Sequence, residues 1–183
     1  PFVVATAPVY TLTNPSAVVN VPKIIFSYSE FISTFGAVPD DEDEADYGLN
    51  EFARIYFTLY NMAPIVAVNV FDPSTHKTAV DAESKTFSAA GTITLANKWV
   101  SGIMVKSSDE QTTYDLTDDY TVAHGTDGTC TISRVTDGDI AALASVKVDY
   151  SYADVGEVAA DDIVGTYDAA TEAYTGLECS ELV

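Results

Sequence analysis

The hydrophobic positions in the first third of the chain predict short strands. Phe2–Ala5 and Lys23–Phe26 are brief runs rich in β-branched, aromatic and other apolar residues, a composition typical of strands. Ile65–Phe71 is a nearly continuous apolar run, the pattern expected of a parallel strand whose two faces are both covered by helices.

Two helices are predicted between these runs. Ser27 and Glu30 have the spacing of a capping box, and Phe26 and Phe31 stand where a hydrophobic staple would place them. One apolar stripe follows at helical intervals and consists of Tyr28, Phe31, Ile32 and Phe35, after which Gly36 provides a stop. A second, longer helix is expected from about Tyr47 to Asn61, buried along the stripe Phe52, Ile55, Tyr56 and Leu59 and ended by Pro64.

From about Lys77 to Ala153 the apolar period changes to two. The clearest alternation places Val146, Val148, Tyr150 and Tyr152 between Lys147, Asp149 and Ser151, which is typical of a half-buried antiparallel strand. The same alternation recurs at Ile93/Leu95, Ile103/Val105, Tyr120/Val122 and Cys130/Ile132, and Asp127-Gly128 and Asp137-Gly138 indicate turns. Six or seven short strands are expected, enough for a small β-sandwich or barrel.

The helical pattern returns near the end of the chain. Ala160-Asp161-Asp162-Ile163 is typical of a helix start, because acids are favoured near the positive end of the helix dipole. Gly176–Val183 is predicted to open another helix. The expected fold class is mixed α+β: a partial α/β core of order β-α-α-β with a returning helical segment (residues 1–78 and 154–183), interrupted by an inserted small antiparallel β-sandwich or barrel domain (residues 79–153). Since the chain opens directly on a strand and the returning segment has no closing strand, we expect both ends of this core to be missing.

Composition restricts the classes of partner. The formal net charge is −20, yet 47% of the residues are hydrophobic, which is too apolar for a chain kept disordered by self-repulsion. So acidic a chain is a poor match for nucleic acid or an anionic membrane, since both are bound mainly through Lys and Arg. No apolar run approaches the roughly 20 residues that span a bilayer, and no export signal is recognised. Residues 1–39 contain one Lys and one Glu, whereas residues 154–183 contain acids and no basic residue.

Motifs of known chemistry are missing from the sequence. It has no GxxxxGK[ST], GxGxxG, GxSxG or HExxH pattern. His76 and His124 are interpreted as ordinary surface loop histidines, and Cys130 and Cys179 as buried thiols. A Cys130–His124 pair with Asp127 would lack an identifiable third element, and Tyr150 and Tyr152 favour sheet packing over a carbohydrate platform. We therefore expect no catalytic residue, cofactor or metal, and a protein that is not an enzyme.

One acidic run is the candidate contact site. It consists of Asp40, Asp41, Glu42, Asp43, Glu44 and Asp46. The run lacks the spacing of a calcium-binding EF-hand loop, so the alternatives are a solvated connector and a loop that contacts a basic surface on a neighbouring subunit.

The order and spacing of several segments resemble the tail sheath proteins of contractile bacteriophages and prophages. The matching segments are Pro1–Pro8, Val21–Ile25, Ser27–Phe31, Phe35-Gly36, Ala67–Pro73, Asp118–Val122, Val146–Tyr152, Asp161–Gly165 and Thr175–Glu178. Together they are distributed along most of the chain, from Pro1 to Glu178.

This resemblance implies a structural subunit that polymerises helically around a tail tube and contracts to drive the tube through a bacterial envelope. The implied partners are other copies of the sheath protein and the tail tube protein, and the implied location is the virion, after assembly in the cytoplasm of the bacterial host. The family's subunits are longer and are joined by terminal arms that add strands to a shared sheet, so a fragment without its ends is expected not to polymerise alone. The alternatives are an adhesin-like surface module whose β domain binds a ligand and, less favoured, an enzyme.

Overall fold

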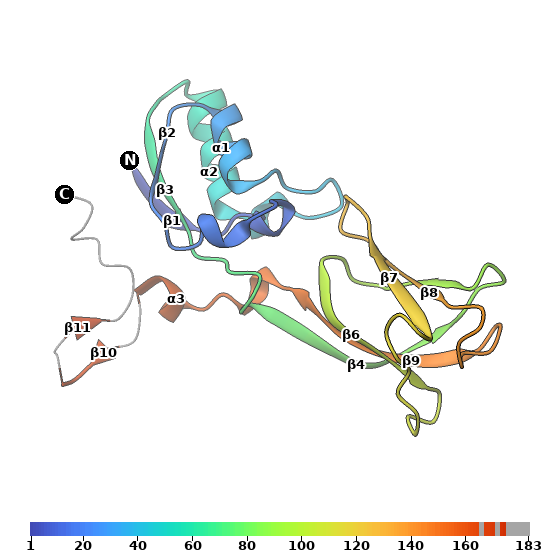
Figure 1. Cartoon of the computed structure of the whole chain (residues 1–183). Coiled ribbons are helices and arrows are strands. Elements are labelled where there is room, and N and C mark those ends of the chain that lie inside the picture. Colours follow the sequence, from blue (N-terminus) through green and yellow to red (C-terminus); the bar gives the residue numbers. More distant parts are fainter. Residues whose placement is uncertain (165–166, 171–172, 175–183) are drawn as a thin grey trace. The chain divides into compact units, whose positions relative to one another are not determined.

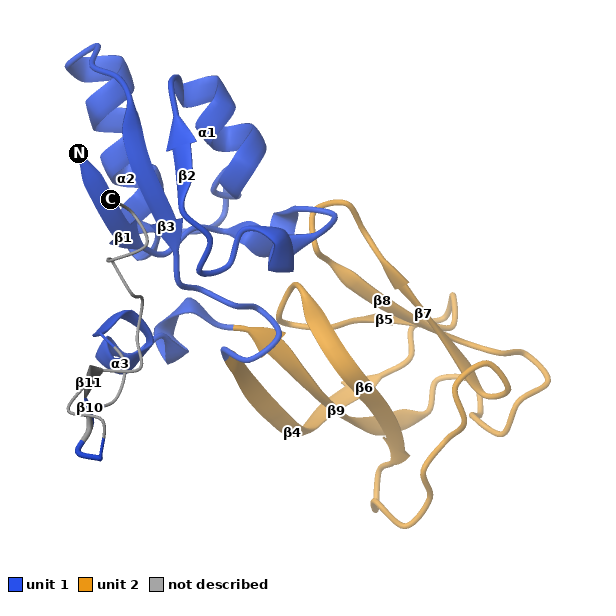
Figure 2. Cartoon of the chain, turned by 60° about the vertical axis from the view of Figure 1, so that its left-hand side comes forward, with its two compact units in different colours: residues 1–76, 154–183 blue, residues 77–153 orange. Residues whose placement is uncertain are grey.

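A computed structural model of the chain describes residues 1–164, 167–170 and 173–174. Contacts divide the chain into two compact units, which are residues 1–76 with 154–183, and residues 77–153 (Figure 2). Helices and strands occur in the first unit and strands in the second, so the mixed α+β class is confirmed. The helix predicted at Gly176–Val183 and the thiol of Cys179 lie outside the described residues.

The first unit contains a three-stranded sheet of order β1-β3-β2. Its strands are β1 (Phe2–Ala5), β2 (Lys23–Ile25) and β3 (Ile65–Asn69). The central strand β3 is parallel to β1 and antiparallel to β2, and Val66 is the register partner of both Phe2 and Ile24. The three predicted strands are therefore confirmed, two of them with earlier ends, and the apolar run of β3 has one parallel and one antiparallel neighbour.

Helix α1 (Tyr28–Phe35) forms as its local signals predict. Ser27 Oγ accepts a hydrogen bond from the Glu30 N–H at 3.2 Å, and the Glu30 carboxylate accepts one from the Phe26 N–H at 2.8 Å. This is a capping box shifted by one residue, because the second bond reaches the residue before the N-cap. Phe31 and Phe35 are buried, but the proposed staple partner Phe26 stays 63% exposed.

The second predicted helix is shorter than expected and buries a different stripe. Helix α2 covers only Gly48–Arg54 and continues as a π-helical turn, η4 (Ile55–Leu59). Leu49, Ala53 and Phe57 are buried, whereas Leu59 is 71% exposed. The predicted stripe assumed a regular 3.6-residue period to Asn61, and the wider turn, with its i→i+5 bond from the Tyr60 N–H to the Ile55 carbonyl, breaks that period.

Shorter elements complete the first unit. They are η1 (Val9–Thr11), η2 (Pro15–Ala17), η3 (Glu44–Asp46), η5 (Val155–Glu157), α3 (Ala160–Val164), β10 (Tyr167–Asp168) and β11 (Ala173–Tyr174). The predicted helix start at Ala160 is thus confirmed. Helices α1 and α2 lie on the same side of the sheet (Figures 1 and 2), and the alternate residues Ile25, Ile65 and Ala67 are buried.

The second unit contains six strands, as the change of period predicts. They are β4 (Lys77–Thr86), β5 (Thr92–Thr94), β6 (Val100–Ser107), β7 (Tyr120–His124), β8 (Cys130–Arg134) and β9 (Ser145–Ala153). They form two antiparallel sheets of order β4-β9-β6 and β5-β8-β7. Val146, Val148 and Tyr150 of β9 belong to the same buried cluster as Ile93 and Ile132 of the other sheet, so the two sheets share one core.

Strands β4 and β6, which both pair with β9, have an irregular register next to Asp149. The register of β4 shifts between Val80 and Glu83, and that of β6 between Ser101 and Met104. The Ala82 N–H at the first bulge donates a 2.7 Å hydrogen bond to Asp149 Oδ1, and Lys106 pairs with the same carboxylate at 2.5 Å. Asp149 therefore supplies an acceptor where the regular ladder is interrupted.

Candidate functional site: the acidic loop and its anchors

The acidic loop between α1 and α2, residues 40–46, is organised by its own side chains. Asp43 Oδ1 accepts a hydrogen bond from the Ala45 N–H at 3.0 Å and so caps η3. The Glu42 N–H bonds to the Pro39 carbonyl at 3.0 Å, which closes a turn before the cap. The loop therefore has defined local structure.

Glu42 anchors the middle of the loop to the core of the first unit. Its carboxylate accepts short hydrogen bonds from the Tyr10 and Tyr47 hydroxyls, which themselves lie 2.6 Å apart. Both tyrosines are buried, and burial raises the pKa of each hydroxyl above its ordinary value, with the Glu42 carboxylate adding to the rise. The two hydroxyls consequently remain protonated donors at neutral pH.

Two further contacts hold the end of the loop. Glu44 pairs with Arg54 of α2 at 2.9 Å, and the Asp46 carbonyl accepts a hydrogen bond from Thr6 Oγ1 at 2.8 Å. Glu42 and Glu44 thus have partners inside the chain.

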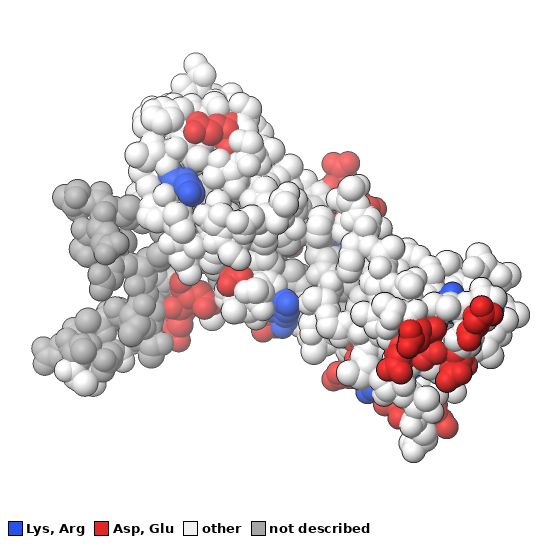
Figure 3. Space-filling model, viewed as in Figure 1, with Lys and Arg blue, Asp and Glu red and all other residues white. Residues whose placement is uncertain are grey.

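The remaining predicted contact residues, Asp40, Asp41, Asp43 and Asp46, are exposed. The structure brings the six acids together on one loop, and their contact with another subunit stays a prediction. On the face visible in Figure 3, the red surface of Asp and Glu is more extensive than the blue surface of Lys and Arg. Among the residues described, no group of three or more His, Cys, Asp or Glu side chains is arranged to hold a metal ion.

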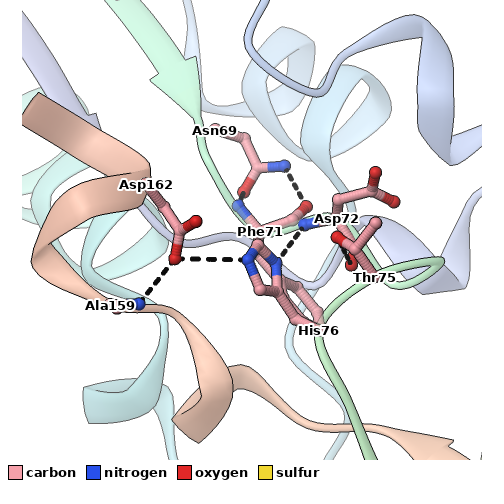
Figure 4. A network of polar contacts seen from close by, with 7 residues as sticks. All are labelled: Asn69, Phe71, Asp72, Thr75, His76, Ala159 and Asp162. Atoms are coloured by element: carbon pink, nitrogen blue, oxygen red, sulfur yellow. Dashed lines mark hydrogen bonds and ion pairs between the residues drawn. The ribbon is translucent and has the colours of Figure 1, made fainter. Parts of the chain in front are cut away.

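His76 is not the ordinary surface histidine that its loop sequence predicts. Its side chain is 12% exposed and stacks on Phe71, with ring centroids 5.9 Å apart. Nδ1 accepts a hydrogen bond from the Asp72 N–H at 2.9 Å, while Nε2 lies 3.3 Å from Asp162 Oδ2 (Figure 4). Because Nδ1 is an acceptor, the neutral ring carries its proton on Nε2, the nitrogen that lies next to Asp162.

This histidine joins the segments where the chain leaves and re-enters the first unit. Asp162 also accepts a 2.6 Å bond from the Ala159 N–H, and the Asp154 N–H bonds to the His76 carbonyl at 3.1 Å. The buried side chain of Asn69 closes the other side, where its Oδ1 accepts bonds from the Ala7 and Phe71 amides. We call these contacts around His76 the histidine clasp (Figure 4). Sequence patterns missed the clasp, since its partners are distant in the chain.

The other histidine and the described cysteine form no reactive pair. His124 and Cys130 are register partners in the β7–β8 hairpin, but the His124 side chain is exposed while Cys130 is buried. Burial raises the pKa of the Cys130 thiol, so that it is protonated at neutral pH. The prediction of a buried thiol is confirmed at Cys130, and Tyr150 is buried in the sheet core as expected.

A cavity of about 350 Å³ lies beside β1. It is bordered by Val4, Thr6 and Asp46 on one side and by Val155 and Ile163 of the returning segment on the other. Asp46 is the charged residue of this mainly apolar lining. The polar groups around Glu42 and in the histidine clasp bond to each other and to the backbone. These two networks and the mainly apolar cavity favour packing or binding over acid–base chemistry.

Comparisons with known proteins supply the remaining observations. The model of the family described as "Protein of unknown function UCP028589" matches residues 54–161. A tail sheath protein of Burkholderia phage BcepMu is 35% identical over 115 residues, which is 61% of this chain and 23% of that protein. The chain therefore spans about a quarter of the length of this curated relative. No solved structure matches the chain, and no helix within the described ranges is long and apolar enough to cross a membrane.

Proposed function

Since the chain belongs to the family described as "Protein of unknown function UCP028589", which assigns it no role, we propose its function from the phage relative: it is a structural, non-enzymatic part of a phage tail sheath. The observation that carries the proposal is the 35% identity over 115 residues to a tail sheath protein. In this role the chain polymerises helically with other copies around the tail tube, and contraction of the lattice drives the tube through the bacterial envelope. Its location is the virion.

The extent of the similarity supports a shared architecture. The family match at residues 54–161 contains the whole second unit together with β3 and the start of α3. The 115 matched residues of the phage relative are also more than the second unit alone can supply. Because the similarity includes parts of both units, it favours a common role for the two units together. A β domain shared with an otherwise unrelated protein would match in the second unit alone.

Immunogold electron microscopy tests this function. Antibodies raised against residues 1–183 are applied to tail particles purified from the bacterium that carries the gene. The proposal predicts label along the full length of the sheath in both extended and contracted tails. Label confined to the baseplate or the fibres, or no label on tails whose sheath is intact, would contradict it.

We further propose that the exposed acids of the loop, Asp40, Asp43 and Asp46, face basic surface on a neighbouring sheath or tube subunit. The anchoring of Glu42 and Glu44 supports this, because it holds the loop in one conformation and so lowers the entropic cost of contact. Attraction of this kind weakens as salt screens it, over a Debye length of about 10 Å at 0.1 M.

Neutralising substitutions in the complete sheath test the loop. The variant Asp40→Asn/Asp43→Asn/Asp46→Asn is expected to assemble less readily at low salt and to lose most of its salt dependence. The matched control neutralises three exposed acids of the second unit, Glu110→Gln/Asp118→Asn/Asp137→Asn. Unchanged assembly and salt dependence in the loop variant would show that the loop takes no part in the contact.

A further inference from the structure

The chain passes between its two units twice, and the two crossings adjoin. It leaves the first unit after His76 and re-enters it at Asp154. The Asp154 N–H donates a 3.1 Å hydrogen bond to the His76 carbonyl. Immediately beyond, Lys77 and Ala153 are register partners at the ends of β4 and β9. We call the peptides 76–77 and 153–154 the crossing point.

The first unit has contacts of its own that close the crossing point. In the histidine clasp, His76 Nε2 lies 3.3 Å from Asp162, and Nδ1 accepts a hydrogen bond from the Asp72 N–H. Val70 and Ile163 border the same cavity. All these residues belong to the first unit, so the clasp joins its two segments without any residue of the second unit.

The second unit likewise has a core of its own. The described members of the buried cluster that joins its two sheets, from Phe87 to Tyr150, all belong to this unit. Ile132 and Val148, one from each sheet, are fully buried in it. The first and last strands of the unit, β4 and β9, pair with each other. A unit of this size with a single core can be stable by itself.

We propose that the second unit is an autonomous module, which folds and unfolds independently of the first unit and can be removed at the crossing point. A carbonyl bonded to the N–H three residues later defines a β-turn. If Asn-Gly replaced residues 77–153, His76 and Asp154 would be the first and fourth residues of such a turn, and their existing hydrogen bond would close it. Asn-Gly is the pair favoured in two-residue hairpin turns. The proposal concerns folding and stands independently of the sheath function.

Two variants of the full chain test the independence of the units. Ile132→Asp/Val148→Asp buries two unpaired charges and so unfolds the second unit, which the fluorescence of Trp99 reports. Hydrogen exchange in β1 and β3 is expected to stay within about twofold of the wild type. Conversely, Phe31→Asp places a charge at a fully buried position of the first unit, and the urea midpoint of Trp99 fluorescence is expected to stay unchanged.

The matched controls add the same charge at an exposed leucine of each unit. They are Leu59→Asp and Leu116→Asp, at side chains that are 71% and 56% exposed, and both units are expected to stay folded in them. Exchange in β1 and β3 that becomes more than about tenfold faster when the second unit unfolds would overturn the proposal. A shifted Trp99 midpoint in Phe31→Asp would overturn it as well.

The excision variant, with Asn-Gly in place of residues 77–153, tests the crossing point itself. Because the clasp and the turn bond remain, the amides of Asp154 and of residues 159–164 are expected to keep their protection from hydrogen exchange within about twofold of the full chain. Loss of this protection, or of the secondary structure of the first unit by circular dichroism, would show that the second unit cannot be removed at this point.

Discussion

Asp119 illustrates how a single carboxylate organises part of the second unit. It is buried, and its two oxygens accept hydrogen bonds from the Asp115 N–H at 2.8 Å and the Asp139 N–H at 2.7 Å. These bonds join the loop before β7 to the loop before β9. They favour the ionised form, so the pKa of Asp119 lies below its ordinary value.

The lowered pKa predicts an acid-dependent loss of stability. A carboxyl whose folded pKa is depressed stabilises the fold above its unfolded pKa of about 3.9, and that contribution disappears as the pH falls through the folded value. Asp119→Asn presents an NH2 group to one of the two donors, so this variant is expected to be less stable at pH 7 and to lose less stability on acidification. Thermal unfolding from pH 7 to pH 2 measures both effects. The neighbouring exposed residue Asp118, changed to Asn, is the control, and equal acid sensitivity of Asp119→Asn and wild type would refute the role.

Ala82 provides a second prediction at the scale of one residue. It has a φ of 53° at the bulge of β4, a left-handed conformation that costs an L-residue roughly 1–2 kcal/mol. Ala82→Gly relieves that cost and keeps the N–H that bonds to Asp149, so we expect a net stabilisation of up to about 1 kcal/mol after the backbone entropy of glycine is counted.

Urea unfolding of the second unit measures the effect of Ala82→Gly. Trp99 is the one tryptophan of the sequence and lies in this unit, so its fluorescence follows the transition. Ala79→Gly in the same strand lacks a positive φ and is expected to destabilise by about 0.5–1 kcal/mol. Destabilisation by both substitutions would mean that the bulge does not strain Ala82.

At the scale of elements, the histidine clasp determines whether the returning segment stays on the first unit. The described part of α3 is only five residues long, too short to be stable by itself. His76→Ala removes both ring contacts. We therefore expect hydrogen exchange at amides 159–164 to become roughly fivefold faster, as loss of about 1 kcal/mol of hydrogen bonding implies.

Hydrogen exchange followed by mass spectrometry measures this prediction. Asp161→Asn, an exposed neighbour of Asp162, is the control and should leave exchange unchanged. Exchange in strands β4 to β9 should also stay as in the wild type, because the clasp residues belong to the first unit. Wild-type protection of residues 159–164 in His76→Ala would show that the segment is held by other contacts.

Elements were predictable where their determinants are local. The cap at Ser27, the apolar stripe and Gly36 were sufficient to specify α1, and strict alternation identified β9. Strand β4 had no predicted pattern, because its bulge at Ala82 interrupts the alternation. The stripe assigned to the second helix was wrong, since the π-helical turn at residues 55–59 changes the period.

The candidate site was predictable only in part, for the same reason. The charge of the acidic loop is visible in the sequence, but its anchors are not, because Tyr10 meets Glu42 only after the chain has folded. The contact between His76 and Asp162 is likewise not visible in the sequence, because the whole second unit lies between these two residues in the chain. Contacts made by tertiary packing leave no periodic signal for sequence reasoning to detect.

At the scale of the whole molecule, the chain is strongly acidic, with a formal net charge of −20. Surface carboxylates keep copies apart unless specific contacts offset the repulsion. In a sheath, such contacts must hold neighbouring subunits together in two arrangements of the lattice, and polar surfaces that can exchange partners fit that need. The proposed role of the acidic loop in such contacts is tested by its neutralising substitutions.

Cryo-electron microscopy of the intact tail tests the central claim most directly. If the chain is part of the sheath, the two units, each fitted separately as a rigid body, occupy density in every subunit of the helical layer surrounding the tail tube. A sheath layer without density for either unit, with the fold found instead in the fibres or the baseplate, would contradict the claim that this chain is part of a tail sheath.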